Sequence, residues 1–100
     1  MKWMEIIELR SVSSHQKSVE EKLKSIIEEL DKQIKKQDFK LYSHISLEND
    51  YCIQLFYDSK NADINGSPLG MHLLSGLKEY GLVNHSVWIE RHMKEFSLRK

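Results

Sequence analysis

The sequence predicts an α+β fold of the ferredoxin-like type, a four-stranded antiparallel sheet with two helices on one face. Two observations lead to this prediction. Apolar residues recur at helical spacing in two segments, and they alternate with period two in four others. The elements follow in the order βαββαβ, and right-handed crossovers between parallel strands place both helices on the same side of the sheet.

The first strand and the first helix occupy the N-terminal third of the chain. Residues 2–12 are partly apolar on both faces, as expected for a strand near the middle of a sheet. After a polar connector, Ser18 and Glu21 form a capping-box pattern. Apolar residues then recur at helical spacing as far as Ile34. We therefore predict a helix at about residues 18–36.

The middle of the chain has the pattern of a β-hairpin. Residues 39–48 alternate between apolar and polar side chains, which predicts a second strand. Asn49 and Asp50 tolerate the left-handed conformation and predict a tight turn before a third strand at 51–57. A polar loop at 58–66 leads away from this strand.

The second helix has clear start and stop signals. Ser67 is a good N-cap, and Pro68 falls at the first helical position, where its missing N–H costs nothing. Gly81 is placed to end the helix in the left-handed region, with Leu82 contacting Leu77 across the stop. The alternation that follows predicts a fourth strand, which continues to His92.

Alternation also assigns the two faces of the sheet. The helix-facing layer is predicted to contain Ile7, Leu9, Phe39, Leu41, Ile45, Leu47, Ile53, Leu55, Val83, Val87 and Ile89. This layer is expected to pack on Leu23, Ile26, Ile27, Leu30, Leu73 and Leu77.

Length and composition restrict the class of protein. One hundred residues predict a single domain covering 1–100. Fifteen basic and fifteen acidic side chains cancel, which argues against a nucleic-acid partner. The lone Cys52 excludes an internal disulfide and a multi-cysteine zinc site. The chain shows no signal-peptide pattern and no apolar run of bilayer length, so we expect a cytoplasmic protein with no membrane partner.

The face opposite the helices predicts self-association. It mixes aromatic with ionisable side chains, and a single copy would leave Ile6, Phe56 and Trp88 in water as one patch. Two such sheets packed together would bury the apolar side chains and enclose the polar ones around a cavity. We therefore predict a homodimer that closes sheet against sheet with isologous symmetry.

At this point the chain resembles the dimeric α+β barrel superfamily, which includes the antibiotic-biosynthesis-monooxygenase-like proteins. The resemblance covers nearly the whole chain and rests on element order and the two-faced sheet. It implies a dimeric barrel and, for an enzyme, a cofactor-independent monooxygenase or isomerase-like activity. Haem-degrading members use an Asn, a Trp and a His. Here Asn84, His85 and Trp88 share the last strand and the first strand has no Asn, so the resemblance implies no haem or other cofactor.

Candidate site residues are taken from this open side of the sheet. His44, His92 and Glu90 are the candidates for proton transfer, since imidazole and carboxylate can exchange protons in a cavity. The alternative is that they are solvated strand residues. No local spacing of these residues suggests a metal site. The predicted ligand-binding residues are Tyr42, His44, Gln54, Phe56, Asn84 and Trp88.

Two functions of different classes remain open. The first is binding or oxidation of a small apolar or aromatic ligand in the pocket of a dimeric α+β barrel. The second is a non-catalytic module for homodimerisation or protein interaction, with Trp88 as an interface anchor.

His85 falls on the helix-facing side of its strand, where a histidine is expected to donate to a backbone carbonyl.

Overall fold

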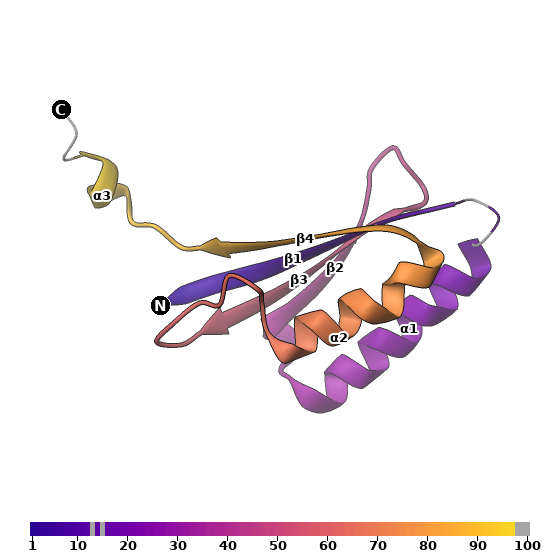
Figure 1. The fold of residues 1–100 in the computed structure, drawn as a ribbon, viewed down its shortest axis with the longest axis horizontal. Helices are drawn as coiled ribbons and strands as arrows, with labels where there is room; N and C mark the ends of the chain where they lie inside the picture. Colours follow the sequence, from indigo (N-terminus) through magenta and orange to yellow (C-terminus); the bar gives the residue numbers. More distant parts are fainter. Residues whose placement is uncertain (13, 15, 98–100) are drawn as a thin grey trace.

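The fold of the chain is a ferredoxin-like βαββαβ domain (Figure 1). A computed structural model describes residues 1–12, 14 and 16–97. Its main elements are β1 (Lys2–Ser11), α1 (Gln16–Gln33), β2 (Phe39–Ser43), β3 (Asp50–Asp58), α2 (Pro68–Leu77) and β4 (Gly81–Ile89). They are supplemented by the short helices η2 (Lys36–Asp38), η3 (Lys78–Tyr80) and α3 (Met93–Ser97).

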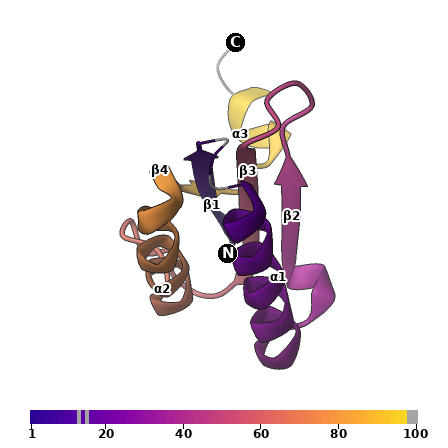
Figure 2. The same ribbon diagram turned by 90° about the vertical axis from the view of Figure 1, so that its right-hand side faces the viewer.

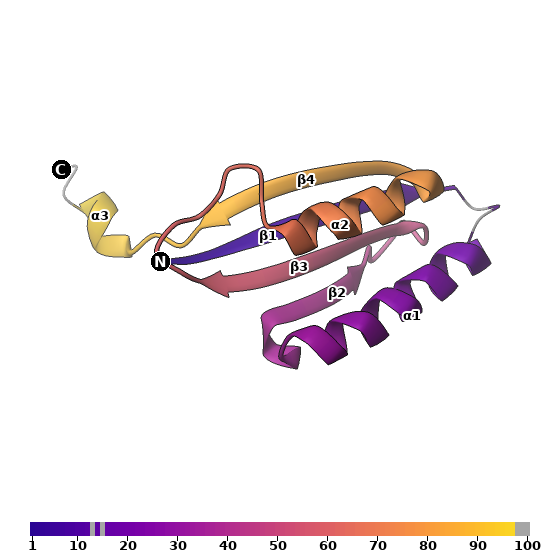
Figure 3. The ribbon, with the colours of Figure 1, turned by 60° about the horizontal axis from the view of Figure 1, so that its bottom comes forward.

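The four strands form one antiparallel sheet in the order β2-β3-β1-β4. The first strand is central, as its two partly apolar faces predicted. It pairs with β3 from Lys2 opposite Asp58, and with β4 from Trp3 opposite Ile89. Both long helices cover the same face of the sheet (Figures 2 and 3). The predicted fold class is therefore confirmed.

The core lies between this face and the two helices. Apolar side chains at helical spacing on α1 and α2 are buried against alternate residues of the strands, which is the packing that the two periodicities require. The buried cluster contains Ile7, Leu9, Val19, Leu23, Ile26, Leu30, Phe39, Ile53, Leu55, Leu73 and Leu77.

The hairpin between β2 and β3 differs from the prediction. β2 ends at Ser43, and Ile45 and Leu47, which were assigned to the core, lie in an exposed loop; Ile45 is 98% exposed. The reason is local hydrogen bonding. The His44 N–H donates to Asp50 O, while the Asp50 N–H donates to Leu47 O, so the chain turns before the alternating pattern ends. Two other predicted core residues, Leu41 and Ile89, lie at sheet edges and are exposed.

The ends of the helices also depart from the sequence pattern. α1 begins at Gln16, so Ser18 lies inside the helix and the predicted capping box does not start it. At α2 the predicted cap is confirmed, because the Ser67 side chain accepts from the Gly70 N–H. The stop is different: η3 leads directly to Gly81, the first residue of β4. Leu82 consequently faces away from the helices and is 76% exposed, so its predicted contact with Leu77 is wrong.

The C-terminal end of β4 lies near the start of β1. The last hydrogen bond joins the Glu90 N–H to Lys2 O, and β1 offers no further partner beyond that point. The strand therefore ends at Ile89 rather than at His92 as predicted. The chain continues into α3, which the sequence did not predict and which lies beyond the end of the sheet (Figure 1).

Candidate functional site

The surface of the sheet opposite α1 and α2 is here called the open face, and no helix of the described residues lies over it (Figures 2 and 3). Antiparallel register places its side chains in rows across the strands. One row is apolar: Met4 lies opposite Phe56 on β3 and opposite Trp88 on β4. These three residues are called the apolar row. Their side chains point away from the helices, as predicted, and Trp88 is 55% exposed.

Two hollows lie at opposite ends of the open face. The larger, here called the polar hollow, has a volume of about 480 Å³, and its lining includes Glu8, Arg10, Tyr42, His44, Cys52 and Asn84. The smaller, the apolar hollow, has a volume of about 310 Å³, and its lining includes Lys2, Met4, Phe56, Trp88 and Glu90. Both volumes are within the range of small-ligand sites.

The predicted site residues divide between these hollows. Three of the ligand-binding residues line the polar hollow: Tyr42, His44 and Asn84. Two others line the apolar hollow together with the candidate proton donor: Phe56, Trp88 and Glu90. Gln54 lies between the hollows, in the row that it shares with Ile6 and Lys40. His92 follows β4 and lies in the lining of neither hollow.

The polar hollow presents hydrogen-bonding groups rather than a nucleophile. The Arg10 Nε lies 3.2 Å from Asp50 Oδ2, and the Asn84 amide lies 3.5 Å from Glu8 Oε1. Burial, together with the negative charge of Glu8, raises the pKa of the Cys52 thiol. Cys52 is therefore held as a neutral thiol near pH 7, which disfavours a role in nucleophilic chemistry.

His44 stands at the edge of the polar hollow, directly after β2. Its Nδ1 accepts the backbone N–H groups of Ser46 and Leu47 at 3.0 and 3.1 Å. The imidazole thus closes the turn of the hairpin loop, which explains why the strand does not continue through it.

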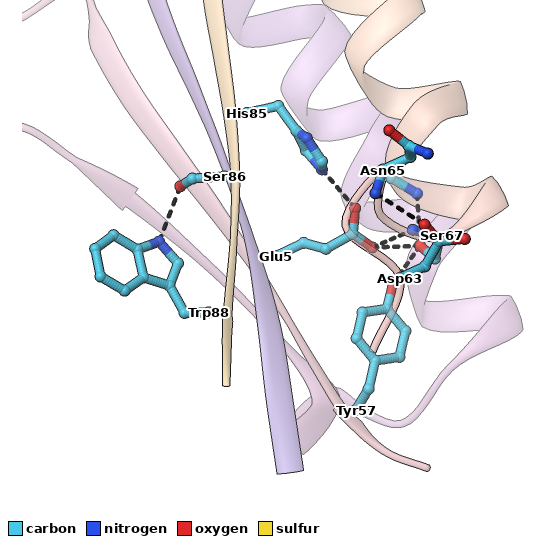
Figure 4. A network of polar contacts seen from close by, with 9 residues as sticks. Glu5, Tyr57, Asp63, Asn65, Ser67, His85, Ser86 and Trp88 are labelled. Carbon is cyan, nitrogen blue, oxygen red and sulfur yellow. Dashed lines mark hydrogen bonds and ion pairs between the residues drawn. The ribbon is translucent and has the colours of Figure 1, made fainter. Parts of the chain in front are cut away.

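A second polar cluster was not predicted and lies under the helices. Glu5 is on the buried face of β1, and its side chain is 0% exposed. Its Oε2 lies 2.7 Å from His85 Nε2, while its Oε1 accepts from the Ser67 N–H at 2.9 Å and from the Ser67 hydroxyl (Figure 4). His85 was expected to donate to a backbone carbonyl, and its partner is instead this carboxylate. We call Glu5, Tyr57, Ser67 and His85 the buried carboxylate cluster.

Tyr57 completes the cluster from β3. Its hydroxyl lies 2.6 Å from Ser67 Oγ, and its ring stacks on Trp3 with centroids 4.3 Å apart. The start of α2 is therefore hydrogen-bonded directly to β1 and β3, and through Glu5 to His85 of β4. Two glycines permit the close approach. A Cβ on Gly66 would lie 2.2 Å from Glu5 Oε2, and one on Gly70 only 2.0 Å from it.

The protonation states of the cluster follow from these contacts. Burial alone would raise the pKa of Glu5, but hydrogen bonds from Ser67 and His85, with a further contribution from Tyr57, lower it overall. Burial raises the pKa of Tyr57, with Glu5 adding to the effect. Glu5 is thus ionised and Tyr57 neutral near pH 7. The groups satisfy one another, so the cluster anchors α2 to the sheet.

One signal in the sequence could have revealed this cluster. Glu5 alternates with Trp3, Ile7 and Leu9, so it belongs to the buried face of its strand, where an acidic residue requires partners. The identity of those partners depends on the pairing of β1 with β4 and on the position of α2, which no local pattern specifies.

Comparison of the chain with family models, with curated proteins and with solved structures gives no match. Within residues 1–12, 14 and 16–97, no three His, Cys, Asp or Glu side chains gather as a group that could hold a metal ion. In the same part of the chain, no helix has the length and apolar character needed to cross a membrane.

Proposed function

We propose that the protein binds a small aromatic ligand in the polar hollow, and that two copies pair through their open faces to cover it. The observation that carries this proposal is the polar hollow itself. All four strands supply polar or aromatic side chains to one space of about 480 Å³ on the open face, opposite α1 and α2. An arrangement of this kind agrees with the dimeric α+β barrel architecture that the chain resembles.

The composition of the polar hollow suits a small ligand of mixed character. Tyr42 offers an aromatic face, and Leu82 adds apolar surface. Glu8 and Asn84 offer hydrogen-bonding groups from adjacent strands. A ring with one or two polar substituents would match this distribution, because apolar walls supply affinity and a few polar groups fix orientation.

The apolar row supports pairing with a second copy. Trp88, Met4 and Phe56 form a continuous band across three strands, and Trp88 is 55% exposed although it is a large aromatic residue. Contiguous apolar surface of this kind typically marks an interaction site. Positive and negative side chains occur on the same face, so a second open face carries the charges needed to complement it.

The pairing is tested by sedimentation equilibrium at about 10 μM, a concentration within the range of ordinary dimer affinities. We expect the wild type to sediment as a dimer and a Phe56→Ala/Trp88→Ala double variant as a monomer. Met71→Ala is the matched control, since Met71 is an exposed apolar residue on α2, which packs on the opposite side of the sheet. A monomeric wild type would refute the pairing.

The ligand is tested by titrating the ¹⁵N-labelled protein with 4-ethylphenol and following the backbone amide signals. We expect shifts confined to the polar hollow, including Tyr42, Cys52 and Asn84. Asn84→Ala is expected to weaken binding. Absence of shifts, or shifts scattered over the surface, would refute ligand binding at this place.

A second candidate function is self-association without a ligand. It is favoured by the apolar row, which exists independently of the polar hollow. A wild-type dimer together with no response to 4-ethylphenol would support this alternative.

The proposed function is ligand binding rather than catalysis, because Cys52 is held as a thiol and His44 Nδ1 is occupied by the turn. Oxidation or isomerisation of the ligand would need a group outside this pair.

A further inference from the structure

The orientation of His44 determines what it can offer to a ligand. Two backbone N–H groups, of Ser46 and Leu47, converge on its Nδ1 at 3.0 and 3.1 Å. Both are donors, so the ring atom that meets them must carry a lone pair and no proton. A neutral imidazole then has its proton on Nε2.

We infer that His44 is held in the Nε2–H tautomer and serves the polar hollow as a hydrogen-bond donor. Nδ1 cannot take up a proton from a ligand without breaking both hydrogen bonds of the turn. Its role therefore differs from the proton transfer expected from the sequence. It positions a ligand by donating to an acceptor atom.

Nε2 of His44 is available for this role. His44 is an exposed residue in the lining of the polar hollow, and Nε2 is the ring nitrogen that takes no part in the turn. Within the described residues, the ring forms no hydrogen bond other than the two on Nδ1. A donor in this position would be satisfied by a ligand oxygen.

The inference rests on the proposed function and specifies the class of ligand. His44 requires an acceptor such as a carbonyl oxygen, while the Glu8 carboxylate requires a donor such as a hydroxyl group. The strands that lead to these residues, β2 and β1, flank β3 and are roughly 10 Å apart at the backbone. A small aromatic molecule with a carbonyl group at one end and a hydroxyl group at the other has the matching pattern.

The tautomer is measured directly by long-range ¹H–¹⁵N NMR of the full chain at pH 8, where an ordinary imidazole is neutral. We expect the ¹⁵N pattern of an Nε2–H ring for His44, identified by the loss of its signals in His44→Asn. An Nδ1–H pattern, or an averaged one, would overturn the inference. This measurement needs no ligand and so stands apart from the proposed function.

The specificity is measured with a pair of probes, 4-hydroxyacetophenone and 4-ethylphenol, which differ in the carbonyl oxygen. Gain of one hydrogen bond predicts about three- to tenfold tighter binding of 4-hydroxyacetophenone. In His44→Asn the shorter side chain can still accept from the Ser46 N–H in an Asx turn. The ratio of the two affinities should then fall to near unity, and unchanged backbone amide signals of Ile53 and Leu55 in β3 would show that the hairpin is intact.

The outcomes separate the two proposals. Equal affinity of the wild type for both probes refutes the donor role of His44 but leaves ligand binding in place. Binding of neither probe refutes the proposed function and, with it, the ligand class. A preference for 4-hydroxyacetophenone that persists in His44→Asn assigns the donor to another residue and overturns the inference.

Discussion

Glu5 Oε2 and His85 Nε2 lie 2.7 Å apart and link the central strand to its edge neighbour beneath α2. The two residues are not directly opposite, since Glu5 faces Val87 and His85 faces Ile7. Their contact is a diagonal one between residues on the same face. Because Glu5 also accepts from the Ser67 backbone, the pair determines where α2 begins relative to the sheet.

Replacing the buried carboxylate should destabilise the fold. Glu5→Gln keeps the shape of the side chain but removes its charge and replaces one acceptor oxygen with an NH₂ group. Loss of a buried charged partner with several hydrogen bonds predicts a fall of about 2–4 kcal/mol in the free energy of unfolding. Urea denaturation measures this change.

Glu8→Gln is the matched control, because Glu8 lies on the same strand but on the open face and is exposed. A change within about 0.5 kcal/mol is expected for this surface substitution. Equal effects of the two substitutions would contradict the assigned role of Glu5.

The buried carboxylate should also make stability depend on pH in a defined range. The pKa of Glu5 is lowered from 4.5 in the folded protein, so the unfolded chain takes up this proton first. The stabilisation from Glu5 is therefore complete above about pH 4.5 and is lost as the pH falls below it. The difference in free energy of unfolding between wild type and Glu5→Gln should remain large from pH 7 to about pH 5 and should decrease below pH 4.5. A constant difference down to pH 3 would count against this ionisation state.

Two glycines of α2 should respond to alanine in opposite ways. At Gly70 the new Cβ would lie 2.0 Å from Glu5 Oε2, a fixed atom, so Gly70→Ala should destabilise by about 1–3 kcal/mol. At Gly76 the nearest atoms belong to the flexible Lys22 side chain at 3.5 Å. Gly76→Ala should then stabilise the protein by about 0.5–1 kcal/mol through helix propensity. Thermal denaturation compares the two variants, and a stable Gly70→Ala would show that the close approach is not required.

The thiol of Cys52 should react slowly at neutral pH. Burial and then Glu8 raise its pKa from 9.0, so little thiolate is present near pH 7. The rate of alkylation by iodoacetamide should rise with pH to a midpoint above 9.0. Glutathione under the same conditions provides the reference, and a midpoint at or below that of glutathione would contradict the environment described for Cys52.

Much of the fold could be predicted because its signals are local. Period-two and helical spacing specified the elements, and the Ser67-Pro68 pair specified the start of α2. Alternation also placed Trp88 and Phe56 on the open face. The end of β2 could not be predicted this way, because the bonds from Ser46 and Leu47 to His44 override the alternating pattern.

The candidate site was predictable only in part for a related reason. The residues of the open face follow from alternation, but their division into two hollows depends on register between strands that are distant in sequence. The buried carboxylate cluster joins Glu5, Tyr57, Ser67 and His85 from four separate segments. Its partners meet only after the sheet has formed and α2 has docked, so no spacing in the sequence identifies them.

The two tryptophans lie on opposite sides of the same sheet. Trp3 is buried, stacks on Tyr57 and donates from its indole to Ser59 Oγ, whereas Trp88 is open to solvent. In a single copy acrylamide should therefore quench the long-wavelength emission of Trp88 and spare the blue-shifted emission of Trp3, and pairing of two open faces should protect Trp88 as well. The chain thus contains two natural fluorophores, one sensitive to unfolding of the interior and the other to anything that covers the opposite surface.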